Sequence, residues 1–223
     1  MRTRGASEVR SRQQELHLPT WGGRRAGAGR KRRPGRRRMP HGPRPVFGHR
    51  CPLHITIRVA DHVYNLRSRR ARSAVERMLR GCAGAFGVSI VQVSVQGNHI
   101  HLLVEAPDQV SLSRAMKGMG VRLARCLNKL MGRTGPVLGD RYHARRLRTP
   151  TEVTNTIHYI RNNFRKHEAQ CGRHVPASFV DPCSSDGELA ALVSAPTVWL
   201  LCGGLRGPPP SVPVPYGTRF KLA

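Results

Sequence analysis

The stretch Gly97-Asn98-His99-Ile100-His101-Leu102-Leu103-Val104-Glu105 sets two histidines on either side of one apolar residue and then continues as an apolar run. Side chains alternate between the two faces of a β-strand, so both histidines point to one face and the apolar residues between and after them mostly to the other. The pattern predicts a strand with one face in a core and two imidazoles on the opposite face, within reach of one metal ion. The spacing is a weak signal by itself, because a chain of 223 residues with 11 histidines is expected to contain roughly 0.5 such pairs by chance.

Three further strands are predicted around this one. Residues 53–59 alternate apolar and polar side chains, as a half-buried strand does, and residues 88–96 are rich in Val and Ile. Gly97-Asn98 predicts a tight turn that joins the second of these strands to the histidine strand as a hairpin. Residues 136–147 are expected to form the fourth strand.

Apolar stripes at helical spacing predict three helices. The first covers about residues 67–86. The second covers about residues 111–131, with Ser111 as its N-cap and Gly132 as its terminator. The third begins at Thr149-Pro150 and runs to about residue 167, and its buried stripe consists of Val153, Ile157, Ile160 and Phe164.

The element order β-α-β-β-α-β-α predicts the α+β class, with a ferredoxin-like antiparallel four-stranded sheet and helices on one face. The other face is expected to stay uncovered, except where the last helix leans over its edge. This uncovered face carries His54, Thr56, Arg58, His99 and His101.

The third helix also carries a polar pair. Tyr159 and Asn163 are four residues apart, so they lie on the same face of the helix. At 100° per residue, that face is turned roughly 100° away from the apolar stripe. Tyr159 is therefore not required for packing and is free to face something else.

Positive charge extends along the chain, which has a net charge of +27. Residues 1–50 hold 15 Lys and Arg against 2 acidic residues, and residues 51–170 hold 20 against 7. An excess of this size in the part expected to fold favours a polyanionic partner, with nucleic acid as the leading candidate. Residues 1–48 have no periodic apolar face and are predicted to be a disordered basic arm, either a phosphate-contacting segment or a leader ahead of a start at Met39.

Composition excludes several other classes. The six cysteines are widely spaced and form no Cys-x-x-Cys pair, which argues against a zinc ribbon and favours reduced thiols in a cytoplasm. No apolar run approaches 18 residues, so we expect no membrane-spanning helix and no membrane partner. Beyond residue 170 the periodic signals fade. The expected organisation is therefore an arm over 1–48, one domain over 49–170 and a poorly ordered tail over 171–223.

The motif His99-Ile100-His101, followed by Tyr159-Ile160-Arg161-Asn162-Asn163, resembles the single-tyrosine HUH transposases, and most closely the REP-associated tyrosine transposases. The resemblance covers roughly residues 50–168. It implies that His99, His101 and Asn163 bind a divalent ion, Mg²⁺ or Mn²⁺, and that Tyr159 is the nucleophile. It also implies a bacterial, nucleoid-associated enzyme that cuts single-stranded or hairpin DNA, forms a 5′-phosphotyrosine link and transfers the strand. A homodimer is compatible with it.

Other interpretations remain open at this point. Tyr142 is a rival nucleophile, and Glu105, on the histidine face, is a candidate fourth ligand. A non-catalytic, domesticated DNA- or RNA-binding protein would have the same fold, and so would another HUH endonuclease such as a replication initiator or relaxase. Six basic residues are candidates for gripping DNA phosphates, namely Lys117, Arg122, Arg141, Arg145, Arg146 and Arg148.

Overall fold

The computed structural model describes residue 44 and residues 46–206. The chain divides into two units, residues 1–37 and 38–223. The first unit lies outside the described residues, as do most of the predicted basic arm and residues 207–223. The account below concerns the second unit.

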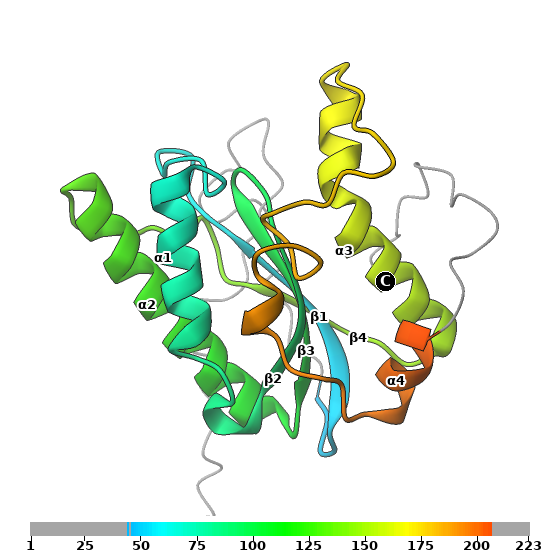
Figure 1. Ribbon diagram of the computed structural model, residues 1–223. Coiled ribbons are helices and arrows are strands. Elements are labelled where there is room, and N and C mark those ends of the chain that lie inside the picture. Colours follow the sequence, from blue (N-terminus) through cyan, green and yellow to red (C-terminus); the bar gives the residue numbers. More distant parts are fainter. Residues whose placement is uncertain (1–43, 45, 207–223) are drawn as a thin grey trace, which may run out of the picture. The chain divides into compact units, whose positions relative to one another are not determined.

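A four-stranded antiparallel sheet forms the centre of this unit (Figure 1). Its strands are β1 (Cys51–Arg58), β2 (Ser89–Val95), β3 (His99–Ala106) and β4 (His143–Arg146), in the spatial order β2-β3-β1-β4. β1 pairs with both β3 and β4, and β2 forms the hairpin with β3. The order and pairing confirm the ferredoxin-like α+β fold. β4 is shorter than the predicted strand over 136–147.

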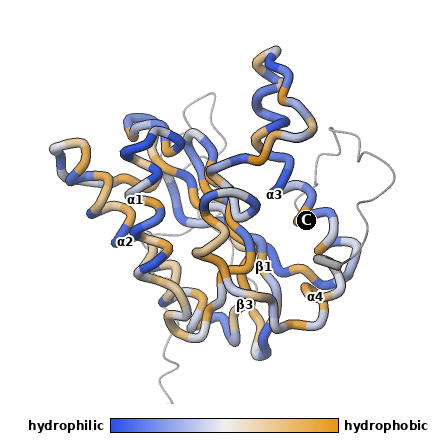
Figure 2. Tube along the Cα trace, in the orientation of Figure 1, coloured by the Kyte–Doolittle hydropathy of each residue, from blue (hydrophilic) through white to orange (hydrophobic). Residues whose placement is uncertain are grey.

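Two helices, α1 (Arg69–Arg80) and α2 (Gln109–Met131), cover one face of the sheet (Figure 1). The apolar side chains of the histidine strand, Ile100, Leu102 and Val104, are fully buried on this side. Figure 2 shows hydrophobic residues gathered in the middle of the sheet. Gly132 ends α2 in the left-handed conformation, as predicted. The N-cap is Asp108 rather than Ser111, because the Asp108 carboxylate accepts the backbone N–H of Ser111.

The opposite face is not uncovered, which corrects the expectation from the sequence. The helix α3 (Pro150–Gln170) lies over it, and the short helix α4 (Trp199–Arg206) packs beside α3 (Figure 1). A second apolar cluster fills the space between this face and the two helices, and it comprises Val91, Leu103, Leu147, Val153, Ile157, Ile160 and Leu201. Thr149 caps α3 as predicted, but Phe164 is only partly buried and Asn163 takes the buried position instead.

Residues 171–206 also differ from the expected poorly ordered tail. Their backbone runs beside β2, where Val95 N–H donates to Cys183 O and Ser185 N–H donates to Val93 O, each with an N···O distance of 2.9 Å. These bonds satisfy the outer edge of β2, which would otherwise present unpaired backbone groups. The apolar signal was missed because it is carried by isolated residues, such as Leu189 and Leu201, rather than by a periodic stripe. Among the described helices, none is long and apolar enough to cross a membrane.

Candidate active site

The register of β1 and β3 assembles a polar group on the sheet face beneath α3. His101 lies opposite Thr56, and His99 lies opposite Arg58. Residues paired across antiparallel strands point to the same side, so His54 and Thr56 share the face with both histidines. The imidazole centroids of His99 and His101 are 4.7 Å apart. This is less than the roughly 6.6 Å that separates residues i and i+2 along a strand, so the two rings lean toward each other.

Helix α3 presents three polar side chains to this group, Tyr159, Asn163 and His167, at four-residue spacing. The ring of Tyr159 lies 5.2 Å from that of His101, centroid to centroid, and meets it edge to face. Asn163 Nδ2 lies 3.0 Å from His101 Nε2. The ring of His167 lies 5.7 Å from that of His99. The structure thus brings together the four residues predicted from the sequence, His99, His101, Tyr159 and Asn163.

The hydrogen-bond partners indicate which ring nitrogen of each strand histidine carries the proton. Asn98 Oδ1 accepts from His99 Nδ1 over 2.7 Å, which leaves the lone pair on His99 Nε2. Asn163 Nδ2 can only donate, so in this orientation of the amide His101 Nε2 accepts and the ring proton is on Nδ1. His101 Nδ1 lies 3.2 Å from Thr56 Oγ1 and 3.1 Å from His54 Nε2. Each ring therefore turns a basic nitrogen away from its supporting partner, as metal-binding histidines do.

Burial keeps these imidazoles neutral. It lowers the pKa of His101 to about 2, with further lowering from His54, His99 and His167. It lowers the pKa of His99 and of His54 to about 4. A histidine must be unprotonated to bind a metal, so both Nε2 lone pairs are available at neutral pH.

The residues present fit a divalent metal. Asn163 is only 2% exposed, and its Oδ1 is buried with no hydrogen-bond partner within the described part of the chain. A half-turn of this amide exchanges Oδ1 and Nδ2, which places an oxygen beside His101 Nε2. Two imidazole nitrogens and one amide oxygen form a set that can hold a divalent ion, but imidazole ligands by themselves suit Zn, Cu or Ni, so this ligand set does not select Mg²⁺ or Mn²⁺. No group of three or more His, Cys, Asp or Glu side chains that could hold a metal ion occurs among residues 44 and 46–206.

Tyr142, the rival nucleophile, does not reach this site. It packs against the main core, on the side of α1 and α2, and its hydroxyl accepts from Arg44. The Arg44 guanidinium also lies over the ring, with its central carbon 3.8 Å from the centroid. Burial raises the pKa of Tyr142, which makes its phenolate harder to form. Tyr159, by contrast, is 40% exposed and is accessible to a substrate.

Glu105 has a structural contact in place of the metal-ligand role considered above. Its side chain is fully buried, and its carboxylate accepts the backbone N–H groups of Thr197 and Val198 at 2.8 and 2.7 Å. These residues directly precede α4. Glu105 therefore holds the start of α4 against the sheet.

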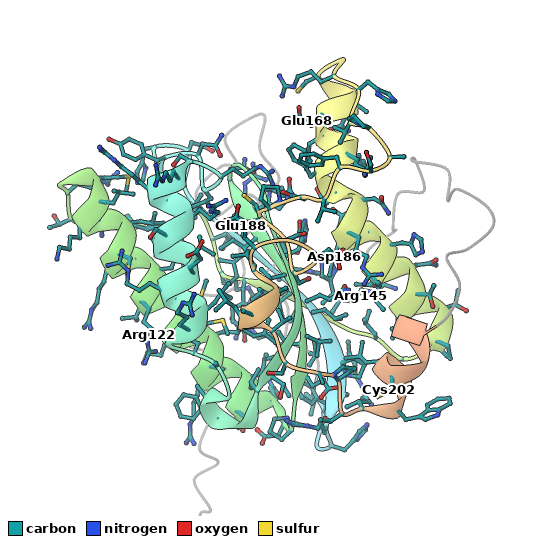
Figure 3. The ribbon with its side chains drawn as sticks, viewed as in Figure 1. Arg122, Arg145, Glu168, Asp186, Glu188 and Cys202 are labelled. Atoms are coloured by element: carbon teal, nitrogen blue, oxygen red, sulfur yellow. The ribbon has the colours of Figure 1, made fainter. Side chains whose placement is uncertain are left out.

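The six predicted phosphate-binding residues do not form one surface. Arg145 lies opposite His54 in the sheet, so it shares the histidine face, and it forms an ion pair of 2.8 Å with Glu152. Arg146, the next residue, pairs with Leu53 and contacts His49. Arg148 is exposed, whereas Arg141 is partly buried. Lys117 and Arg122 belong to α2, on the other side of the sheet, and Figure 3 shows Arg122 and Arg145 far apart on the two sides.

Three neighbours of the site carry weak sequence signals. His54 was expected on the histidine face, but its contact with His101 depends on the register between β1 and β3. Asn98 was assigned only to the turn. His167 follows Asn163 by four residues, and this continuation of the Tyr159–Asn163 spacing could have revealed it.

Known proteins similar to this chain are found among family models and among solved structures. A family model described as "Transposase IS200 like" matches residues 48–163, a segment that contains the four predicted site residues. Among solved structures, a REP-associated tyrosine transposase bound to a REP hairpin is 15% identical, with a TM-score of 0.49, and the match covers 71% of this chain and 93% of that chain. A proposed transposase from Deinococcus radiodurans R1 is 16% identical, with a TM-score of 0.39, over 61% of this chain and 100% of that chain. No curated protein matches.

Proposed function

Because this chain belongs to the IS200-like transposase family, we propose that it is a metal-dependent single-stranded DNA endonuclease and strand transferase that uses Tyr159 as its nucleophile. The single observation that carries the proposal is the convergence on His101 of Tyr159 and Asn163, two α3 residues far from it in sequence. We place the catalytic unit within residues 49–170 and regard residues 171–206 as its support.

His99 Nε2, His101 Nε2 and Asn163 Oδ1 would hold the ion, Mg²⁺ or Mn²⁺. When bound, a divalent ion withdraws charge from the scissile phosphate and favours attack in line with the leaving oxygen. Asn98, Thr56 and His54 keep the two imidazoles in the required tautomer and orientation. Asn163 lies one turn after Tyr159, so the position of the nucleophile is tied to that of the ligand set.

The proposed reaction exchanges one phosphate ester for another. Tyr159 Oη loses its proton and bonds to phosphorus, while the bond from phosphorus to the 3′ oxygen breaks and that oxygen takes up a proton. The product is a 5′-phosphotyrosine link and a free 3′-hydroxyl strand. A second 3′-hydroxyl can attack the link and release Tyr159, which rejoins DNA without a further energy source.

We further propose single-stranded or hairpin DNA as the partner. Arg145 shares the face of the ligand set, and exposed Arg148 follows on the link to α3, so these residues are suited to the phosphates beside the cut. Lys117 and Arg122, on the α2 side, would contact a different part of the same DNA. Arg141 and Arg146, whose side chains are partly buried, remain candidates for contact with DNA phosphates.

The test uses hairpin oligonucleotides with single-stranded flanks of random sequence, incubated with the full chain and Mn²⁺ or Mg²⁺. After denaturation, a 3′-label is expected to migrate with the protein, and a 5′-label is expected on a shorter free strand. Tyr159→Phe should abolish the adduct, whereas Tyr142→Phe should retain it. An adduct that survives in Tyr159→Phe overturns the proposal, and binding without any adduct favours a non-catalytic DNA-binding protein.

A further inference from the structure

A cavity opens beside the candidate metal site, at the end of α3 away from Tyr159. Its volume is about 580 Å³, within the range that holds a small organic ligand. Three segments form it, namely the loop after β1, the turn between β2 and β3, and the last turns of α3. His99 and His167 belong to its lining, whereas Tyr159, Asn163 and His101 do not.

The lining combines apolar walls, amide groups and ionisable side chains, the last being Arg67, His99, His167, Glu168 and Arg173. Val63 and Phe164 supply apolar surface, and Asn65, Gln96 and Asn98 each bring a side-chain amide. Asn65 Oδ1 and Asn98 Oδ1 accept from Arg67 N and His99 Nδ1, so the NH₂ group of each amide is its remaining donor. Gln96 donates through Nε2 to Ser94 Oγ, so its carbonyl oxygen is the remaining acceptor. Donors and an acceptor in one place match the edge of a nucleobase.

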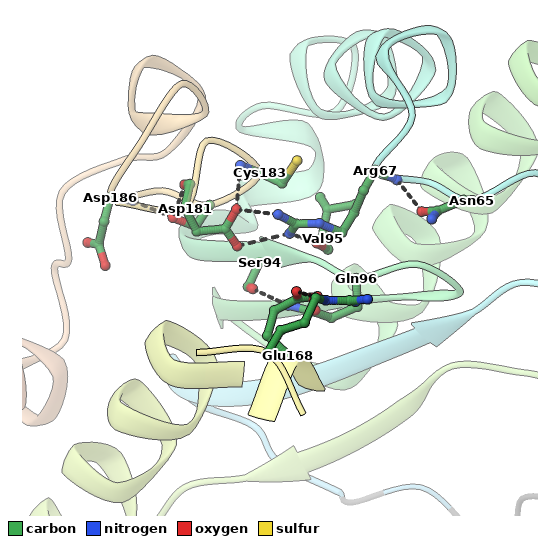
Figure 4. Close-up of polar contacts among 11 residues, drawn as sticks. Asn65, Arg67, Ser94, Val95, Gln96, Glu168, Asp181, Cys183 and Asp186 are labelled. Atoms are coloured by element: carbon green, nitrogen blue, oxygen red, sulfur yellow. Dashed lines mark hydrogen bonds and ion pairs between the residues drawn. The ribbon is translucent and has the colours of Figure 1, made fainter. Parts of the chain in front are cut away.

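Phe164 does not act as a free stacking surface. The guanidinium of Arg67 lies over its ring at 3.9 Å, and the ring of Phe179 lies 5.5 Å away. Figure 4 shows Arg67, Asn65 and Gln96 around the end of β2, with Glu168 close by. Recognition in this cavity therefore depends on the amide groups, and the guanidinium and aromatic ring hold the wall in place.

The position of the cavity selects one side of the cut. Tyr159 and His167 are eight residues apart, which is about 12 Å along a helix, and Asn163 lies midway. In an in-line displacement, the incoming oxygen and the leaving oxygen lie on opposite sides of phosphorus. A phosphate held at His99, His101 and Asn163 and attacked from Tyr159 thus directs its leaving 3′ oxygen toward His167 and the cavity.

We infer that this cavity binds the nucleotide that carries the leaving 3′ oxygen, with its unpaired base among Asn65, Gln96 and Asn98. The inference rests on the proposed function, because it takes the phosphate position from it. The ligand class is a 2′-deoxynucleoside bearing a 3′-phosphate. The nucleotide on the other side of the cut, which stays linked to Tyr159, is directed away from the cavity.

The test uses the four 2′-deoxynucleoside 3′-monophosphates and their 5′ isomers, titrated by calorimetry into the full chain with Mg²⁺. We expect at least one 3′ isomer to bind five-fold or more tightly than its 5′ isomer. Gln170→Trp introduces a large side chain at an exposed position that lines the cavity, and it should weaken that binding ten-fold or more. Ala169→Trp is the matched control, since Ala169 is also exposed and does not line the cavity.

Equal binding of the two isomers, or equal effects of the two tryptophan variants, would overturn the inference. The adduct assay with hairpin DNA separates this failure from that of the proposed function. A chain that forms the Tyr159 adduct but shows no isomer preference keeps the function and loses the cavity assignment. A chain that never forms the adduct loses the proposed function and, with it, the assignment of the cavity to a leaving strand.

Discussion

Removal of either Arg67 or Asp181 should destabilise the protein strongly, because each would leave the other charge largely buried and unpaired. The pair lies where β2 meets residues 171–206 (Figure 4), and Arg67 also stacks on Phe164 of α3. Arg67 Nη1 and Nη2 donate to the two carboxylate oxygens of Asp181 over 3.0 and 2.8 Å, and Nη1 also donates to Val95 O. Only 18% and 7% of the two side chains are exposed. Phe164, which stacks on Arg67, is the residue after Asn163.

Asp181→Ala leaves a largely buried guanidinium without its counter-charge. Removal of one partner from a buried pair typically costs about 3–5 kcal/mol. We expect the free energy of unfolding to fall by that order for Asp181→Ala. A similar fall is expected for Arg67→Met, which leaves the Asp181 carboxylate without its counter-charge. The double variant Arg67→Met/Asp181→Leu leaves no unpaired charge and should lose clearly less than the sum of the two.

Urea unfolding, followed by circular dichroism, measures all three free energies. The pair of Arg173 and Glu168 is the control, since it has the same Arg–carboxylate chemistry and the Arg173 side chain is 64% exposed, against 18% for Arg67. Its disruption by Arg173→Met should cause no resolvable change. If the losses in the Arg67 and Asp181 variants add within about 0.5 kcal/mol, the two charges do not depend on each other and the reasoning is refuted.

Three further predictions concern the histidine face. Asn98→Ala removes the oxygen that accepts from His99 Nδ1, so the Mn²⁺ affinity measured by calorimetry should fall about ten-fold. Asn98→Asp keeps an acceptor there and should retain the affinity. Glu105→Ala removes the acceptor at the start of α4, so it should lower the free energy of unfolding, measured with urea, by about 2 kcal/mol and leave the Mn²⁺ affinity unchanged. A loss of Mn²⁺ binding would instead make Glu105 a metal ligand. Burial lowers the pKa of His101 to about 2 and that of His54 and His99 to about 4, so the unfolded chain binds protons that the folded chain does not. Stability without metal should therefore fall as pH drops from about 6.5 to 4, and His54→Gln should reduce the slope by up to one proton.

The sheet could be predicted from the sequence because each strand shows its own local pattern. The alternation in residues 53–59 and the Gly97-Asn98 turn leave little choice of register, and a shift of one residue would bury the histidines in the main core. The N-cap of α3 could be predicted for the same reason, since Thr149 and Pro150 act within one turn. The strand alternation, the hairpin turn and the helix N-cap each depend only on residues that are close in sequence.

The cover over the histidine face could not be predicted in this way. Leu103, beside His101, and Val91, displaced by the bulge in β2, provide the apolar surface on that face, yet each is a single residue in an otherwise polar set. Their partner Leu201 lies in α4, a helix of only 8 residues, which is too short to show a helical periodicity in the sequence. The same dependence on tertiary contact explains why the buried state of Asn163, next to Phe164, was not foreseen.

The site therefore depends on a part of the chain beyond the family match. The match ends at Asn163, the last of the proposed ligands. Burying three imidazoles and an amide costs free energy unless each polar group has a partner, and the apolar cluster around Leu103 offsets part of that cost only while α3 is held down. Residues 171–206 support α3 at two places. Asp181 pairs with Arg67, which stacks on Phe164 of α3, and α4 packs against α3. A change in this segment should consequently alter metal affinity without touching a ligand.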